Sequence, residues 1–274
     1  MKELEFSVLL SVYKKEKEEY LVDSIQSILN QTIIPNEIVI VEDGPLSTTL
    51  DNIITKFIQT EPNLFKIVKL EKNVGLGLAL NEGLKACSNN LVARMDTDDI
   101  AKKNRFEKQL QIFENNPEVS IVGSNIDEFI TDTQNIVSKR VVPEKNDAIL
   151  KFSKRRNPFN HPTVMYKKSQ VLKCGGYRDF RRNQDYDLFV RMLNHGYTGY
   201  NIQESLLFFR ANTENLSRRK SWPKTKSDIY LRYIFLKKGY SSLHDFLITT
   251  GGFLLVFVTP ISFFNFLNKH LLRK

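Results

Sequence analysis

Short, uninterrupted apolar runs alternate with segments of helical periodicity through the first 125 residues. Ile38–Val41 is apolar at every position, as expected of a strand that is buried on both faces. Between such runs, apolar residues recur at helical spacing, as at Leu21, Ile25 and Ile28. This alternation predicts an α/β fold with an open, mostly parallel, doubly wound sheet and helices on both faces. Strands are expected at 6–11, 38–41, 65–70, 91–95 and 119–123, and helices at 21–29, 53–58, 76–84, 105–115, 185–194 and 222–236.

Acidic residues follow two of these strands at their carboxyl ends, where ligands bind in open sheets of this kind. Asp96-Thr97-Asp98-Asp99 comes directly after the fourth strand. Carboxylates this close raise one another's pKa unless a cation lies among them, and Mg²⁺ or Mn²⁺ prefers carboxylate oxygens. We therefore predict that Asp96 and Asp98 bind a divalent metal ion, which also coordinates a diphosphate. The alternative is an acidic helix start, in which Asp98 or Asp99 caps a segment from Ile100.

Glu42-Asp43-Gly44 ends the second predicted strand. A carboxylate there could accept a hydrogen bond from a nucleobase N–H, and Gly44 permits a tight turn. Ser11 and Tyr13 close the neighbouring first strand, where the Tyr13 ring could stack on the base. Taken alone, the segment is more typical of a simple Asp-Gly-Pro turn.

Two helix starts are further candidates. Asn73–Gly77 follows the third strand but lacks the Lys-Ser/Thr of a P-loop and the full dinucleotide fingerprint, so we interpret it as a turn that lines the pocket. Asn183–Leu188 opens the helix at 185–194, and the carboxylate of Asp185 could deprotonate an attacking hydroxyl there. Capping of the helix by Asp185 is the alternative.

Charge is divided unequally along the chain. Residues 1–150 contain 17 Lys and Arg against 24 Asp and Glu, whereas residues 151–274 contain 23 against 7, a net charge of +16. The basic second half predicts an anionic partner, such as phospholipid headgroups, a lipid diphosphate or nucleic acid. Nucleic acid is disfavoured because the basic runs at 154–156 and 218–220 lack interleaved stacking aromatics.

The cysteines and the first residues indicate a cytosolic compartment. Cys87 and Cys174 have no metal-like spacing and cannot form a disulfide framework, which favours reducing surroundings. Charges at Met1–Glu5 stand where the apolar region of a signal peptide would lie. We therefore expect the catalytic part to stay in the cytosol.

An apolar stretch lies near the C-terminus. Residues 246–264 contain no charged side chain and lie between Lys237-Lys238 and the basic residues of 269–274. The length permits a bilayer span, but Thr249–Gly252 and Thr259-Pro260 interrupt it. We predict a broken hairpin lying in the membrane interface rather than a span. A C-terminal helix packed on the domain is the alternative.

Taken in order, these motifs resemble glycosyltransferase family two, with the resemblance covering about residues 5–220. Val41–Pro45 and Asn157–Thr163 look most like amylovoran-type exopolysaccharide enzymes. The resemblance implies a GT-A domain over 1–220, with a nucleotide-sugar half of about 1–125 and an acceptor half of about 126–220. A helical, hydrophobic and basic extension follows over 221–274. The segments that carry the resemblance are 6–13, 37–44, 73–75, 93–99, 175–177 and 184–188.

The resemblance also implies roles for single residues. Glu42 matches the carboxylate that reads the base, Asp96 and Asp98 match the metal-binding Asp-x-Asp pair, and Asp185 matches the general base. Gly175-Gly176 looks like the acceptor-side loop. The implied donor-binding residues are Ser11, Tyr13, Glu42, Asp43, Asn73 and Asp96.

Two positions depart from the family pattern. Gln184-Asp185 stands where many members have Glu-Asp, so the residue next to the base, which would shift the pKa of Asp185, is different. Phe209–Asn212 stands where many have Tyr-Arg-x-His, so the usual His near the metal or diphosphate is missing. His161 is a candidate substitute, with a structural role as the alternative. Residues assigned to the acceptor side or the diphosphate are His161, Gly176, Asp187, Arg218 and Arg219.

Together these features predict an inverting, metal-dependent glycosyltransferase that uses Mn²⁺ or Mg²⁺. A nucleotide sugar, with a UDP-sugar as first choice, would donate to a lipid-linked saccharide in capsule, exopolysaccharide or O-antigen synthesis. The enzyme would be peripheral on the inner face of a bacterial cell membrane. A sugar nucleotidyltransferase is one alternative, although Ser11–Tyr13 is no glycine-rich loop. A non-catalytic membrane or polyanion binder is another, and it leaves the acidic strand ends unexplained.

Overall fold

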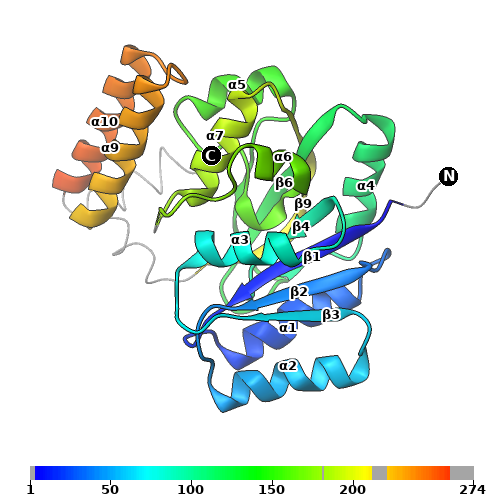
Figure 1. Ribbon diagram of the computed structural model, residues 1–274. Helices are drawn as coiled ribbons and strands as arrows, with labels where there is room; N and C mark the ends of the chain where they lie inside the picture. Colours follow the sequence, from blue (N-terminus) through cyan, green and yellow to red (C-terminus); the bar gives the residue numbers. More distant parts are fainter. Residues whose placement is uncertain (1–3, 181, 212–220, 260–274) are drawn as a thin grey trace.

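The computed structural model describes residues 4–180, 182–211 and 221–259, which form an α/β fold around one sheet (Figure 1). Within these residues the sheet has nine strands in the order β3-β2-β1-β4-β8-β6-β9-β5, and β7 pairs with β6. The strands are β1 (Phe6–Val12), β2 (Glu37–Glu42), β3 (Phe65–Lys69), β4 (Leu91–Arg94), β5 (Ile100–Ala101), β6 (Val119–Phe129), β7 (Ile136–Arg140), β8 (Met165–Lys167) and β9 (Thr198–Arg210). The helices are α1 (Glu18–Leu29), α2 (Thr48–Thr60), α3 (Leu76–Ala86), α4 (Arg105–Asn115), α5 (Asn146–Ser153), the 3-10 helix η1 (His161–Thr163), α6 (Lys168–Lys173), α7 (Gln184–Asn194), α9 (Trp222–Lys237) and α10 (Leu243–Val258).

The first half of the sheet confirms the predicted doubly wound arrangement. Strands β3, β2, β1 and β4 are parallel neighbours. Successive side chains of β1 point to opposite faces. Val8 and Leu10 belong to the core cluster that contains α1, α2 and α4, whereas Leu9 belongs to the cluster that contains α3 and α7. The uninterrupted apolar runs are therefore strands covered by helices on both sides.

The second half of the sheet is mixed and was largely not predicted. β8 runs antiparallel to both β4 and β6, and the long β9 runs parallel to β6. The sequence predicts the strand at 119–123, but β6 continues to Phe129 through buried polar residues. Asp127 and Glu128 lie in this extension, where they pair with Lys102 (2.6 Å) and Arg140 (2.7 Å). Because ion pairs replace apolar contacts there, hydrophobic periodicity does not reveal the strand.

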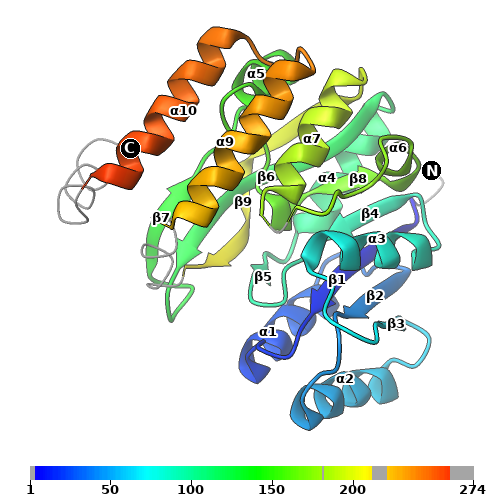
Figure 2. The ribbon, with the colours of Figure 1, turned by 60° about the vertical axis from the view of Figure 1, so that its left-hand side comes forward.

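The predicted break at Thr249–Gly252 is wrong, because these residues lie inside the continuous helix α10. A capping box between Ser242 and Asp245 starts this helix, which packs beside α9 (Figure 2). α10 packs on α9, which in turn buries Leu231 and Phe235 against α7. Residues 260–264 of the predicted hairpin lie outside the described residues. Within the described ranges, none of the helices combines the length and apolar character needed to cross a membrane.

Candidate active site

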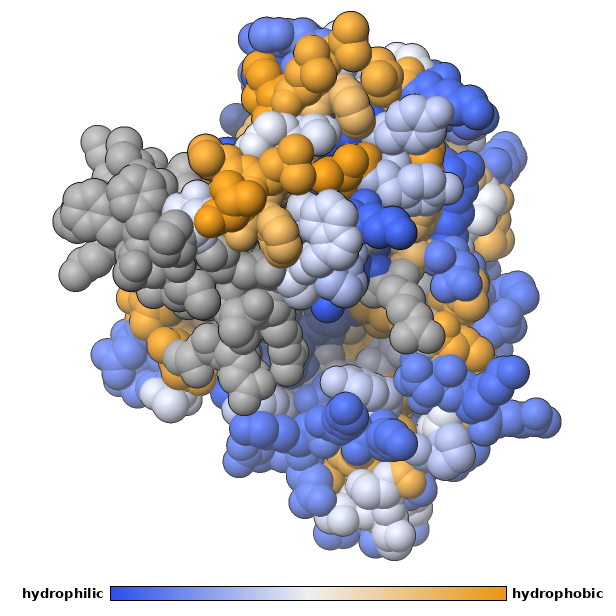
Figure 3. Space-filling view, turned by 90° about the vertical axis from the view of Figure 1, so that its left-hand side faces the viewer, coloured by the Kyte–Doolittle hydropathy of each residue, from blue (hydrophilic) through white to orange (hydrophobic). Residues whose placement is uncertain are grey.

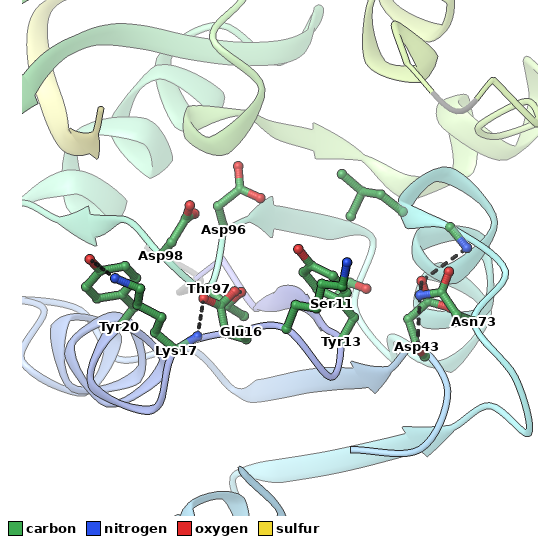
Figure 4. A pocket seen from close by; sticks show the side chains of 13 residues that line it. Ser11, Tyr13, Glu16, Lys17, Tyr20, Asp43, Asn73, Asp96, Thr97 and Asp98 are labelled. Carbon is green, nitrogen blue, oxygen red and sulfur yellow. Dashed lines mark hydrogen bonds between the residues drawn. The ribbon is translucent and has the colours of Figure 1, made fainter. Parts of the chain in front are cut away.

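A cavity of about 470 Å³ lies where β1, β2 and β4 end (Figure 4). The carboxyl ends of parallel strands meet at one edge of the sheet, so residues far apart in sequence share its walls. The predicted gathering of acidic strand ends around one cavity is thus observed. The lining residues are Ser11, Tyr13, Lys15, Glu16, Lys17, Tyr20, Asp43, Asn73, Gly75, Leu76, Asp96, Thr97 and Asp98.

Asp43 joins the end of β2 to the loop before α3. Its buried carboxylate accepts hydrogen bonds from the backbone N–H groups of Val74 (2.7 Å) and Gly75 (3.1 Å) and from Asn73 Nδ2 (2.8 Å). Gly44 follows with φ +83°, and a Cβ there would lie 2.6 Å from the Asn73 nitrogen. Only glycine fits this close approach. The interpretation of 73–77 as a pocket-lining turn therefore agrees with the geometry.

Glu42 lies outside the cavity lining, although the resemblance implied that it reads the base. Its Oε2 is 3.0 Å from Lys69 Nζ on the neighbouring strand β3. Glu42 binds Lys69, whereas Asp43 binds the loop at 73–75, so the two carboxylates point to different partners. Of the two carboxylates, Asp43 lines the cavity together with Ser11 and the partly exposed Tyr13.

Asp96, Asp98 and Asp99 form a carboxylate cluster directly after β4. One oxygen from each lies within 4.8 Å of the others. Burial, with the charges of Asp96 and Glu16, raises the pKa of Asp98 to about 7. Burial and the two neighbouring aspartates also raise the pKa of Asp99. The alternative of a helix cap is wrong, because Ile100–Ala101 is the strand β5.

This cluster fits a hard divalent cation. All of its donors are carboxylate oxygens, which Mg²⁺ and Mn²⁺ prefer. Asp99 Oδ2 is buried and accepts no hydrogen bond from the part of the chain that the structure describes. Figure 4 shows Asp96 and Asp98 projecting to the same side of the β4 end. The predicted pair thus has a third candidate ligand, Asp99.

Two arginines that the sequence analysis did not assign to the site support the cluster. Arg94 is fully buried on β4, and its Nη1 lies 2.5 Å from Asp96 Oδ1. Arg210, at the end of β9, donates from its backbone N–H to Asp99 Oδ1 (2.9 Å) and from Nε to the Asp98 carbonyl oxygen (3.0 Å). Arg94 was not predicted because it ends an otherwise apolar strand. Arg210 was not predicted because it reaches the site only through the pairing of β9 with β5.

The segment after β1 supplies a wall that sequence reasoning also missed. Lys15, Glu16 and Lys17 line the cavity, and Glu16 accepts a hydrogen bond from the Thr97 hydroxyl. Lys17 Nζ donates to the Tyr20 hydroxyl at 3.1 Å. A run of charged residues usually indicates a solvent-exposed surface. This run, however, directly follows a strand of the parallel sheet, and that position could have indicated that it lines the cavity. The two lysines bring positive charge to an otherwise acidic cavity.

Asp185 lies in the first turn of α7, beside the cavity rather than among its lining residues. Its Oδ2 accepts a hydrogen bond from Asn157 Nδ2 at 2.7 Å, and its removal from water raises its pKa. The start of α7 packs on α3, because a Cβ on Gly77 would lie 3.2 Å from Gln184 Cβ. Asp185 is therefore adjacent to the helix start that lines the cavity.

Three residues predicted for the acceptor side, His161, Gly176 and Asp187, contact other parts of the fold and do not line the cavity. His161 is buried, with its Nε2 3.1 Å from the Tyr177 hydroxyl, and burial beside Arg94 lowers its pKa well below the ordinary value. It is not part of the carboxylate cluster. A Cβ on Gly176, whose φ is +62°, would lie 2.5 Å from the Asn81 side-chain oxygen.

Asp187 forms a buried ion pair with Arg191 (2.8 Å), whose guanidinium also donates to the Gly176 carbonyl oxygen at 2.7 Å. It therefore holds the Gly175-Gly176 loop and does not face the cavity. The assignments of Arg218 and Arg219 fall outside the described residues.

The sequence is similar to those of known glycosyltransferases. The sequence profile described as Glycosyl transferase family 2 matches residues 7–186. The chain is 37% identical over 269 residues to UDP-Gal:alpha-D-GlcNAc-diphosphoundecaprenol beta-1,3-galactosyltransferase of Escherichia coli, which covers 98% of this chain and 97% of the relative. It is 40% identical over 226 residues to the amylovoran biosynthesis glycosyltransferase AmsE of Erwinia amylovora, covering 82% and 84%.

Solved structures share the fold at low sequence identity. The mannosyltransferase PcManGT from Pyrobaculum calidifontis, in complex with GDP-Man and Mn²⁺, has a TM-score of 0.67 and 14% identity, covering 93% of this chain and 70% of that one. TarS 1–349 of S. aureus, in complex with UDP, has a TM-score of 0.63 and 16% identity, covering 98% and 73%.

The sheet and the cavity at its strand ends define a GT-A-type α/β enzyme domain. The chain belongs to glycosyltransferase family 2 and is an inverting glycosyltransferase. This assignment argues against the two alternatives, a sugar nucleotidyltransferase and a non-catalytic binder.

Proposed function

We propose that this enzyme transfers a hexose from a UDP-sugar to a saccharide that is linked through diphosphate to a polyprenol. The observation that carries the proposal is the cavity in which Asp43, from the loop after β2, meets Asp96 and Asp98, from the loop after β4, at one sheet edge. The galactosyltransferase of Escherichia coli, similar over nearly the whole chain, is named for such a donor and acceptor.

The donor would lie along the cavity from Asp43 to Asp98. Asp43, Ser11 and Tyr13 are at one end, where a carboxylate, a hydroxyl and an aromatic ring offer hydrogen bonds and stacking to a nucleobase. Lys15 and Lys17 would balance the negative charge of the diphosphate. In this arrangement Asp43, rather than Glu42, takes the base-reading position.

Asp96, Asp98 and Asp99 would hold a divalent cation at the other end of the cavity. Bound there, the cation would neutralise the diphosphate as it leaves. Arg94 keeps the Asp96 carboxylate in place through their ion pair. Arg210 donates from its backbone N–H to the Asp99 carboxylate and from its side chain to the Asp98 carbonyl oxygen. These contacts fix the carboxylates of Asp96 and Asp99 and the main chain of Asp98, where a cation would be held.

Asp185 would take the proton from the acceptor hydroxyl as that oxygen attacks the anomeric carbon. The hydrogen bond from Asn157 orients the carboxylate and stabilises its ionised form. A buried base with a raised pKa is better matched to an alcohol than an exposed carboxylate is. Attack on the face opposite the diphosphate inverts the configuration, in agreement with the family.

The exposed apolar side of α9 and α10 would bring the site to a lipid-linked acceptor at the cytosolic membrane face. Figure 3 shows hydrophobic residues gathered over these helices. Lys237 and Lys238, at the end of α9, would face anionic headgroups. The exposed apolar residues of α10 are Leu243, Leu247, Ile248, Leu254, Leu255 and Val258.

The transfer reaction is tested with purified protein, Mn²⁺, a panel of UDP-sugars and GDP-mannose, and GlcNAc-diphosphate bearing a short alkyl chain. We expect a disaccharide product with one UDP-sugar, UDP-galactose being the first candidate. Release of pyrophosphate from a nucleoside triphosphate and a sugar phosphate, without disaccharide formation, would overturn the proposal.

Membrane binding is tested by sedimentation with vesicles that contain anionic phospholipid. Leu247→Glu/Leu255→Glu should lose vesicle binding, because two charges would enter the apolar face. Ile34→Glu is the matched control, since Ile34 is also exposed but lies in the loop after α1. Equal sedimentation of the double variant and the control would count against this surface.

A further inference from the structure

The turn before Asp185 has an unusual backbone. Asn183 has φ +65° and is the one residue other than glycine with a positive φ among the described residues. A left-handed conformation is unfavourable for side chains with a Cβ, and Asn tolerates it best. The residue before a helix normally has an extended backbone and caps the helix with its side chain. Asn183 has neither feature, because its side chain makes no capping hydrogen bond to α7.

The side chain of Asn183 is instead bound by α9. Its Nδ2 donates to Asp228 Oδ1 at 2.6 Å. The preceding residue, Arg182, donates from Nη1 to Ser221 Oγ at 3.3 Å. Two consecutive residues before α7 are therefore held by residues at and after the start of α9.

The first turn of α7 rests on the same helix. The Arg232 guanidinium lies 4.3 Å from the centre of the Tyr186 ring, and Phe235 meets that ring edge to face at 5.2 Å. The Tyr186 hydroxyl donates to the Ser153 carbonyl oxygen at 2.6 Å. Asp185 thus lies between two residues, Asn183 and Tyr186, whose side chains contact α9.

We propose that Asp228 is a positioning residue that holds Asn183 in its left-handed turn and so sets the direction of Asp185. This inference rests on the proposed role of Asp185 as general base. It makes the extension at 221–259 part of the acceptor side of the site, in addition to its proposed membrane contact. The same helix pair would then orient the base and bring it to the lipid-linked acceptor.

The test compares two substitutions of Asp228 in the full-length protein. Asp228→Ala removes the hydrogen-bond acceptor, whereas Asp228→Asn keeps an acceptor oxygen of the same shape and removes only the charge. We expect Asp228→Ala to lower kcat by about tenfold or more, because a misplacement of about 1 Å can cost about 100-fold. Asp228→Asn should keep most of the activity. Lys226→Ala, an exposed change on the same helix, is the control and should match the unchanged enzyme.

Two readouts separate positioning from a general structural role. The dissociation constant for UDP should change little in Asp228→Ala, because none of the residues that line the donor cavity lies on α9. The thermal unfolding midpoint should change little because Asp228 is only half-buried. A loss of kcat accompanied by weaker UDP binding and the same loss in Asp228→Asn would overturn the proposal. Wild-type kcat in Asp228→Ala would overturn it as well.

A second pair of variants covers the case in which Asp228→Ala does not fold. Asn183→Ala should lose more kcat than Asn183→Gly, because glycine adopts positive φ without support from α9. Equal activity of the two variants would overturn the proposal. Asp185→Asn separates failure of the positioning role from failure of the proposed function. If Asp185→Asn is inactive while the Asp228 variants keep full activity, only the positioning role of Asp228 is wrong.

Discussion

The proposed donor side and the proposed acceptor side of this site are held in place by different parts of the chain. On the donor side, Ser11, Asp43 and Asp96 lie within two residues of the ends of β1, β2 and β4. On the proposed acceptor side, Asp185 accepts a hydrogen bond from Asn157, 28 residues away in sequence, and its neighbour Tyr186 packs on α9. The parallel sheet alone positions the first group, whereas contacts between distant segments position the second.

This difference predicts which substitutions alter donor binding and which alter sugar transfer. Changes on the donor side should alter metal or nucleotide binding with little effect on the rest of the fold. Changes on the acceptor side should alter transfer while donor binding persists. The following predictions test that division.

Asp98→Ala should have the largest effect and lower kcat by about a thousandfold or more, since a bound metal contributes several kcal/mol to transition-state stabilisation. The substitution also relieves repulsion from Asp96 and Asp99, so the metal-free protein should unfold at the same or a higher temperature. Thermal unfolding with and without Mn²⁺ measures both effects. Persistent stabilisation by Mn²⁺ in the variant would contradict the metal site.

Asp185→Asn should lower kcat by about a hundredfold or more, because general base catalysis contributes about that much. The dissociation constant of UDP should stay unchanged, since Asp185 does not line the donor cavity. Isothermal titration with UDP, alongside the transfer assay, checks this separation. Full transfer activity would refute the base assignment.

Asp43→Asn should raise KM for the UDP-sugar by about tenfold, because hydrogen bonds to a charged group are worth about 1.5–3 kcal/mol. The neutral amide would accept more weakly from the Val74 and Gly75 N–H groups, which would loosen the 73–75 loop. Glu42→Gln is the matched control on the neighbouring residue. A larger rise in KM for Glu42→Gln than for Asp43→Asn would return the base-reading role to Glu42.

Asn157→Ala should have the smallest effect, a shift of the pH profile. Asp185 must be ionised to accept a proton, and burial raises its pKa, so kcat falls as pH decreases through that raised value. The Asn157 amide stabilises the ionised form, and its removal should move the acidic limb of the kcat profile to higher pH. At high pH the variant and the unchanged enzyme should converge. An unmoved acidic limb would mean that Asn157 does not tune this carboxylate.

Elements with clear periodicity could be predicted from the sequence almost to the residue. The helix at 105–115 has the predicted bounds, and the strand predicted at 6–11 ends one residue later. The far part of β6 was missed because its buried carboxylates, Asp127 and Glu128, form ion pairs and leave no apolar pattern. β9 was missed because its buried positions do not alternate and its register on β6 is irregular. The break at Thr249–Gly252 was wrong because packing of α10 on α9 outweighs the low helix propensity of glycine.

The sequence by itself determined the layered sheet, the family and the strand-end residues Asp43, Asp96 and Asp98. It could do so because burial on both faces leaves an apolar run, and topology brings the ends of parallel strands to one edge. Only the tertiary structure decided that Asp43 rather than Glu42 lines the cavity, that Asp99 joins the carboxylate cluster, and that α9 supports the turn before Asp185. These depend on side-chain direction and on contacts between segments far apart in the chain, which no local pattern records.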